Sequence, residues 1–250
     1  VGALAGEAHE AFVQIQDHRG PTSLRGTDAS YEVRGSGGLV TVEGKQLDVI
    51  VERSEGPVTL RLSGGSVRGD TWRGTGKVTA ADGTTIDLEG VRGQLSLDLE
   101  ADCDAVVSGV GALLQGNIRW SRLTVSDSSR LAINAESANV DVSGVGTLDR
   151  VDATDSLLTL DLREIEGRPA LALRRGSRVS VQLPMPCQLR TMGPGSTLGS
   201  QVTVYGCEHR TGNQRWGGGA QGVRGIDGSR PVLLTVTLSE DSTIEVEGVQ

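Results

Sequence analysis

The chain has very few aromatic side chains. Phe, Trp and Tyr together make up 2% of its 250 residues. Because each aromatic ring buries a large apolar area, sandwiches and barrels usually build their cores around several of them. This chain must instead build its core from Val, Leu, Ile and Ala in thin, repeated layers. Its 36 glycines suit the tight corners between such layers. The composition therefore favours a solenoid over a sandwich or barrel.

Concentrated basic charge, cysteine and long apolar runs are also scarce. The net charge of −8 argues against nucleic acid as a partner, because phosphate binding needs a dense basic face. No segment approaches 18 consecutive apolar residues, so we expect no membrane insertion. Three cysteines do not make a disulfide framework, and the sequence leaves open whether Cys187 and Cys207 pair. Cys103 lies in the apolar phase of LSLDLEADCD and is predicted to be a buried thiol.

What the chain does have is a long series of short segments that alternate apolar and polar residues. FVQIQ, SYEVR, LDVIVE and RVSVQLP are examples, and Gly, Asp, Ser or Asn separates most of them. No segment between them shows a helical pattern of apolar residues over ten residues, which argues against a βαβ fold. In residues 140–162 the alternation predicts inward Val140, Val142, Val151, Ala153, Leu158, Leu160 and Leu162. The outward positions are Asp141, Asp152, Thr159 and Asp161.

Short motifs recur along the chain. SGVG begins at Ser108 and again at Ser143, 35 positions later, while Ser126-Asp127-Ser128 is echoed 28 positions later by Thr154-Asp155-Ser156. Recurrence of this kind indicates a solenoid, and the unequal spacing predicts coils of uneven length. We therefore predict an all-β, right-handed parallel β-helix formed by one chain. The alternative is a sandwich whose hairpins look alike by chance.

The predicted organisation is one β-solenoid domain over residues 1–250. Residues 1–12 are interpreted as an amphipathic cap helix, because Ala3, Leu4, Ala8, Ala11 and Phe12 fall on one helical face. A frayed terminus is the alternative. Residues 13–208 form the coils, residues 209–231 form a loop rich in Arg and Gly, and residues 232–250 return to alternation as a terminal coil.

The loop at 209–231 is the strongest candidate for a binding surface. It contains Arg210, Arg215, Arg224 and Arg230 beside Trp216. Guanidinium groups match carboxylates in a planar fork, and an indole ring adds a stacking surface. We interpret the five residues as a contact surface for an acidic protein partner or for another copy of the chain. The alternative is a surface insertion whose arginines are solvated.

Metal and catalytic sites receive weaker support. Asp98, Glu100, Asp102 and Asp104 alternate along one strand, but such a row does not converge on one cation, so a solvated face is favoured. Cys187, Cys207 and His209 offer three zinc ligands without an evident fourth. The sequence has no G-x-S-x-G elbow, although a Ser-His-Asp arrangement assembled in space stays open. We assign no catalytic residue, metal or cofactor.

Three stretches, SGVGALLQGNI, RLAINAESANVDVSG and VSGVGTLDRVDATDSLLTLDL, resemble bacterial β-solenoid domains of the adhesin-like type. They are more loosely similar to bactofilin-type cytoskeletal polymers, from which the uneven coils and the Arg-rich loop depart. The resemblance covers about residues 95–185. It implies a non-enzymatic structural, surface or assembly module with a protein partner or homo-oligomer, and it favours an extracytoplasmic or cell-surface location. It supplies no catalytic residue.

The alternative function is a carbohydrate-active enzyme, a polysaccharide lyase or hydrolase on the same scaffold. Such an enzyme needs paired carboxylates in a groove. Sugar grooves also use aromatic platforms, of which this chain has few. The many aspartates nevertheless allow acid pairs on an outer face, so polysaccharide stays open as a ligand.

Overall fold

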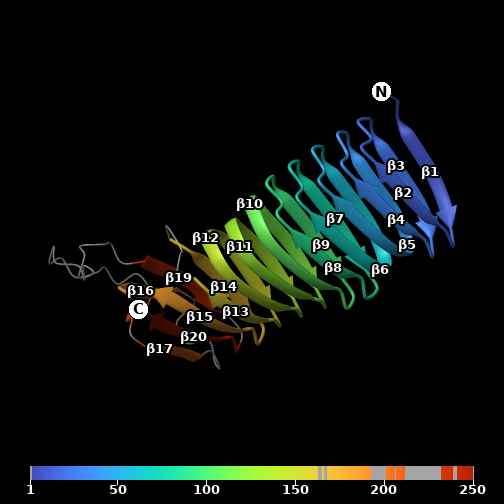
Figure 1. The fold of residues 1–250 in the computed structure, drawn as a ribbon. Coiled ribbons are helices and arrows are strands. Elements are labelled where there is room, and N and C mark those ends of the chain that lie inside the picture. The colour runs from blue at the N-terminus through green and yellow to red at the C-terminus, as the bar shows by residue number, and fades with distance from the viewer. Residues whose placement is uncertain are drawn as a thin grey trace. The chain divides into compact units, whose positions relative to one another are not determined.

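The computed structural model describes residues 2–162, 165, 168–192, 201–205, 207–211, 232–238 and 241–249, the side chains of residues 202, 204 and 209–211 excepted. All regular structure in these ranges is β-strand. No helix in the described part of the chain is long and apolar enough to cross a membrane. The strands pair in parallel and stack as coils, so the predicted β-solenoid is confirmed (Figure 1). The handedness of the coils stays a prediction.

The chain divides into two compact units, Val1–Arg130 and Leu131–Gln250. The strands that begin in the first unit are β1 (Leu4–His9), β2 (Phe12–Gln16), β3 (Thr22–Thr27), β4 (Ser30–Arg34), β5 (Val40–Glu52), β6 (Val58–Asp70), β7 (Gly76–Ala81), β8 (Thr85–Glu89), β9 (Leu95–Glu100), β10 (Asp104–Arg119) and β11 (Arg122–Glu136). The strands of the second unit are β12 (Asn139–Thr154), β13 (Leu157–Asp161), β14 (Ala170–Arg174), β15 (Arg178–Pro184), β16 (Cys187–Met192), β17 (Gln201–Tyr205), β18 (Glu208–Thr211), β19 (Val232–Leu238) and β20 (Thr243–Val249).

In the first unit each coil adds one strand to each of two faces. The first face contains β1, β3, residues 40–45 of β5, residues 58–63 of β6, β7, β9 and residues 114–119 of β10. The second face contains β2, β4, residues 48–52 of β5, residues 66–70 of β6, β8 and residues 104–108 of β10. Partners in consecutive coils are 18 or 19 positions apart.

The core of the first unit consists of columns of aliphatic side chains. Val42, Leu60, Val78 and Leu97 follow one another in register, and each is at most 1% exposed. Each coil adds one thin layer of this kind, and every layer removes apolar area from water on both of its sides. The predicted aliphatic layering is confirmed.

Two aromatic rings do enter this core, and both occupy space beside glycines. The Tyr31 hydroxyl donates a hydrogen bond to the carbonyl oxygen of Arg25, and a Cβ at Gly26 would lie 2.3 Å from that hydroxyl. Trp72 donates from Nε1 to the carbonyl oxygen of Val51 at 2.9 Å, and a Cβ at Gly69 would lie 2.6 Å from its ring. A ring therefore fits only where a neighbouring position has no side chain.

Sharp corners join the two faces, and residues in the left-handed region lie at these corners. Asp17, Gly35, Arg53 and Thr71 take this conformation at steps of one coil. Each donates its backbone N–H to the next coil, as Arg53 does to the carbonyl oxygen of Asp70 at 2.9 Å. The hydrogen bond offsets the strain that a non-glycine residue has in this region.

The same corners explain the repeated motifs. Gly109 and Gly144, the second residues of the two SGVG motifs, both have positive φ, and so does Asp127 between them. The 35-residue spacing therefore covers two coils rather than one, and the 28-residue spacing matches none of the ladders between described strands. Coil length is nevertheless uneven, because the step from β13 to β15 is 21 residues.

The predicted cap helix over residues 1–12 is wrong. Leu4–His9 is strand β1, which pairs in parallel with β3 from Leu4↔Thr22 to His9↔Thr27. The apolar positions of this segment also fit a period of two, with Leu4 and Ala8 separated by Gly6. Pairing with a ready-made strand edge satisfies the backbone of a short segment, whereas an isolated helix of this length is marginal in water.

In the second unit the predicted alternation is confirmed for residues 140–162. The seven predicted inward side chains are at most 3% exposed, and the four predicted outward ones are half-buried or exposed. Two other predictions change. Residues 209–211, assigned to the loop, belong to β18, and the terminal strands β19 and β20 lie between earlier strands, as described below.

We predict that Leu160→Asp lowers the free energy of unfolding by several kcal/mol, because it places an unpaired charge in the core. Leu160 is 1% exposed, whereas its neighbour Thr159 is exposed. Thr159→Asp is the matched control and should change stability by less than about 0.5 kcal/mol. Chemical denaturation of both variants measures the difference, and equal losses would contradict the register of β13.

Candidate functional site

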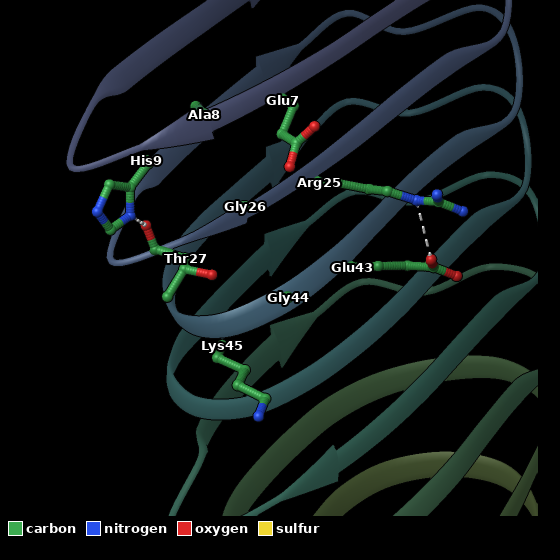
Figure 2. A pocket seen from close by; sticks show the side chains of 9 residues that line it. All are labelled: Glu7, Ala8, His9, Arg25, Gly26, Thr27, Glu43, Gly44 and Lys45. Carbon is green, nitrogen blue, oxygen red and sulfur yellow. Dashed lines mark hydrogen bonds and ion pairs between the residues drawn. The ribbon is translucent and has the colours of Figure 1, made fainter.

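A polar groove lies on the first face of the first unit (Figure 2). It has a volume of about 860 Å³ and is formed by β1, β3 and β5. Its lining residues are Glu7, Ala8, His9, Arg25, Gly26, Thr27, Glu43, Gly44 and Lys45. Three consecutive coils therefore contribute three residues each, at equivalent positions.

The floor of the groove is a column of small residues. Ala8, Gly26 and Gly44 are aligned by the ladders of β1 with β3 and of β3 with β5. At Gly26 the absence of a side chain leaves room beneath the strand for the buried Tyr31 ring. At Gly44 an added Cβ would lie 1.9 Å from the carbonyl oxygen of Gly26. At both glycines the missing side chain thus makes room for backbone and core atoms that lie close to the strand.

One rim of the groove is a column of alternating charge. Glu7, Arg25, Glu43 and Arg61 follow one another in register on four coils. Arg25 Nε lies 3.3 Å from Glu43 Oε2, and Arg61 Nη1 contacts Glu43 Oε1. Pairs this exposed contribute about 0–1 kcal/mol each, so the column adds little to stability. It does place a side chain of opposite charge on each successive coil at this position.

The other rim carries His9, Thr27 and Lys45. His9 Nδ1 lies 3.1 Å from the carbonyl oxygen of Thr27, and His9 and Lys45 are both exposed. The groove as a whole therefore offers carboxylates, a guanidinium, an imidazole, an amine and a hydroxyl at the spacing of adjacent strands, about 4.8 Å. This arrangement can form hydrogen bonds and ion pairs with an extended polar chain or with a further strand.

A second, smaller depression lies on the second face. It has a volume of about 290 Å³ and is lined by Glu52, Arg68, Gly69, Asp70, Asp87 and Glu89. Glu52, Asp70 and Glu89 form one column on β5, β6 and β8. Arg34 Nε lies 3.1 Å from Glu52 Oε2. Among the described residues, no group of three or more His, Cys, Asp and Glu side chains is arranged to hold a metal ion.

The residues predicted as a partner surface cannot be placed together. Arg215, Trp216, Arg224 and Arg230 lie outside the described residues. Arg210 is described through its backbone, which aligns with Arg190 in the ladder of β18 with β16. The proposed contact surface therefore stays a prediction.

The acidic row at 98–104 does not lie along one strand. Asp98 and Glu100 point outward from β9, but Ala101 and Asp102 take the left-handed conformation at a corner, and β10 begins at Asp104. The corner separates the acids, and Asp98 and Glu100 lie 3.8 and 3.2 Å from Arg119. The interpretation as a solvated, charge-paired face agrees with this geometry.

The cysteines resolve into one disulfide and one thiol. Cys187 and Cys207 are joined, with 4.9 Å between their Cα atoms, so neither is free to bind zinc. Cys103 is a buried free thiol, as predicted. Its Sγ donates to the carbonyl oxygen of Glu100 at 3.2 Å, and burial raises the pKa of the thiol, which opposes formation of the reactive thiolate.

No family model, curated protein or solved structure matches this chain. The geometry of its own residues therefore carries the functional argument. The polar groove was missed from the sequence, because its residues are scattered until the coil length is known. The alternation of Glu7, Arg25, Glu43 and Arg61 at 18-residue steps is the signal that would have found it.

We predict that Cys103 makes the protein less stable at alkaline pH. The unfolded thiol ionises near pH 8.5, whereas the pKa of the buried thiol is raised, so the unfolded state binds fewer protons above that pH. The contribution is fully present below about pH 8.5 and is lost as pH rises toward the folded-state pKa. Urea denaturation from pH 7 to 9.5 should show a steeper loss for wild type than for Cys103→Ala, by up to about 1 kcal/mol per pH unit. Parallel profiles would contradict the prediction.

Proposed function

We propose that this chain is a non-enzymatic structural module, a rigid β-solenoid that joins other copies of itself through the first coil. The observation that carries the proposal is the edge of β1 that faces away from β3, along which no strand of the described residues pairs. β1 forms its ladder with β3, and β2 forms its ladder with β4, whereas the strands of the following coils are paired on both sides. Figure 1 shows β1 as the outermost strand of the first unit.

The open edge presents hydrogen-bonding groups and apolar side chains together. In a parallel ladder alternate residues bond to opposite sides, and Leu4 donates to the carbonyl oxygen of Pro21. The backbone groups of Ala5, Glu7 and His9 are therefore directed to the open side. Leu4 and Phe12 are 38% and 64% exposed on the same coil. An unpaired edge beside exposed apolar groups is a template for another strand.

Two further features support the proposal. Glu7 is the first member of the column of alternating charge among the described residues, so a partner that places a cation next to Glu7 continues the pattern. The sequence also resembles adhesin-like solenoid domains, which have structural and surface roles. The Cys187–Cys207 disulfide supports an extracytoplasmic or cell-surface location, because disulfides persist in oxidising compartments.

We predict that Ala5→Pro abolishes concentration-dependent association. Proline removes the backbone N–H at the open edge and cannot pair as a central strand residue. Ala5→Thr is the matched control, since it keeps the N–H and suits a strand. Sedimentation velocity over a range of concentrations should show association for wild type and Ala5→Thr, and a monomer for Ala5→Pro. If wild type forms dimers and nothing larger, two β1 edges meet. If it forms a series of larger oligomers, the contact is head-to-tail.

Circular dichroism must show that Ala5→Pro keeps the β-sheet spectrum and melting behaviour of Ala5→Thr. Association of Ala5→Pro at the concentrations where Ala5→Thr associates would rule out the β1 edge. A monomer for wild type at every concentration would rule out the proposal as a whole.

A second candidate is a carbohydrate-active enzyme that uses the acidic depression on the second face. Glu52, Asp70 and Glu89 come from adjacent coils about 4.8 Å apart, close to the separation of about 5–5.5 Å between the two carboxyl groups of retaining glycosidases. We expect no release of reducing ends from a panel of neutral and acidic polysaccharides. Release that disappears in Asp70→Asn and persists in Asp98→Asn, an outward acid of the first face, would favour the enzyme.

A further inference from the structure

The last two strands of the second unit lie out of sequence order. β19 pairs with β14 on one edge, where Thr235 aligns with Ala170, and with β16 on the other, where Thr235 aligns with Arg190. β20 in the same way pairs with both β15 and β17. Figure 1 shows these two strands, coloured red, among the strands from β14 to β17. The coil formed by residues 232–249, here called the inserted coil, therefore separates coils that are consecutive in sequence.

The inserted coil fills a slot with walls on both sides. Its buried apolar side chains, at most 7% exposed, are Leu234, Val236, Leu238, Ile244 and Val246. Its backbone bonds to both walls, with Thr243 N donating to Ser177 O at 2.8 Å and Gln201 N donating to Ser242 O at 3.0 Å. The described ladders of β16 and β17 run to β18, β19 and β20, so the inserted coil connects that part of the unit to β14 and β15.

The connection to the inserted coil is much longer than its ends require. Thr211 aligns with Thr191, and Val232 aligns with Cys187, so the two ends flank β16 on opposite edges. The two ends are separated by two strand spacings of about 4.8 Å across the sheet and by four residues of about 3.3 Å along the strands. The distance between them is therefore roughly 16 Å, which about five extended residues can span. Residues 212–231 supply 20, with a reach of up to about 66 Å.

We propose that the inserted coil is exchangeable, so that residues 232–249 of one copy fill the slot of a second copy. The ladders and the buried side chains are the same in either arrangement, and the long connection lets either slot be reached. The balance is then set by protein concentration against the effective concentration of the chain's own coil at its slot. The proposal goes beyond association through β1, because it places a second joint between copies in the other unit and does not use the β1 edge.

The test uses cysteines at outward, facing positions of the ladder between β15 and β20. Ser180 and Glu245 are both exposed and aligned, and the natural pair of Cys187 in β16 with Cys207, the residue before β18, shows that a disulfide can join adjacent coils of this unit. Full-length Ser180→Cys and Glu245→Cys chains with different tags are mixed, warmed in a glutathione buffer and analysed by mass spectrometry under non-reducing conditions. We expect a cross-linked heterodimer whose yield rises with total concentration.

The matched control is a mixture of Thr159→Cys and Ser180→Cys chains. Thr159 and Ser180 have the same outward, aligned geometry, but β13 and β15 belong to coils that follow each other along the chain. This mixture should give no heterodimer above collision background. A Ser180→Cys/Glu245→Cys double variant should close within one chain at low concentration, which verifies the geometry.

Each other outcome overturns the proposal. If the double variant closes but the Ser180→Cys and Glu245→Cys mixture gives no more heterodimer than the control mixture, the coil is not exchanged. If the double variant does not close, the strand order itself is wrong. The mixture is repeated with Ala5→Pro in both chains: cross-linking that survives this change belongs to coil exchange and not to the β1 edge, so the two proposals fail separately.

Discussion

The structure depends on in-register stacking of one coil upon the next. Each ladder aligns a residue with its counterpart one coil away, so every position becomes a column and every column has one environment. Inward columns stay apolar, because each layer is packed against the layers before and after it, and a small residue in a column must be matched by a larger neighbour, as Gly69 is by Trp72. The corners must repeat as well, and left-handed corner residues such as Asp17 and Gly35 are held by a backbone hydrogen bond to the following coil. The same ladders therefore stabilise both the faces and the strained corners.

Stacking also explains why the chain has so few aromatic residues. A column of Val and Leu leaves no room for an aromatic ring unless a nearby residue is glycine. Gly26 makes this room for Tyr31, and Gly69 makes it for Trp72. The pair of Gly26 and Tyr31 also affects the surface. The glycine that admits Tyr31 also lies in the lining of the polar groove, so one residue takes part in both the core packing and the candidate site.

Alternation with period two was sufficient to predict an all-β solenoid and the inward residues from Val140 to Leu162, because burial on one side of a strand is a local property. The coil length was harder to read. Corners are occupied by residues as different as Asp17, Arg53 and Gly90, so the sequence gives no constant corner signal, and the repeated SGVG motif marks two coils instead of one. Without the coil length, the columns that form the groove could not be assembled. The helix predicted for residues 1–12 failed because its apolar residues fit both periods, and pairing with β3 decided between them.

The order of coils in the second unit could not be predicted from alternation at all. Residues 232–249 read as a coil, but alternation does not say which neighbours a coil will have, since all coils offer the same kind of ladder. The disulfide restricts the order of the coils locally. It joins Cys187 of β16 to Cys207, the residue before β18, across a sequence separation of 20, and such a loop closure contributes about 3 kcal/mol in the chain-entropy model. The coils on the far side of the slot are thus tied covalently to each other, and those on the near side follow one another along the chain. The inserted coil is held between them by ladders and packing, so stacking, the interaction on which the whole fold depends, is also what must be broken and remade if a coil is to pass from one copy to another.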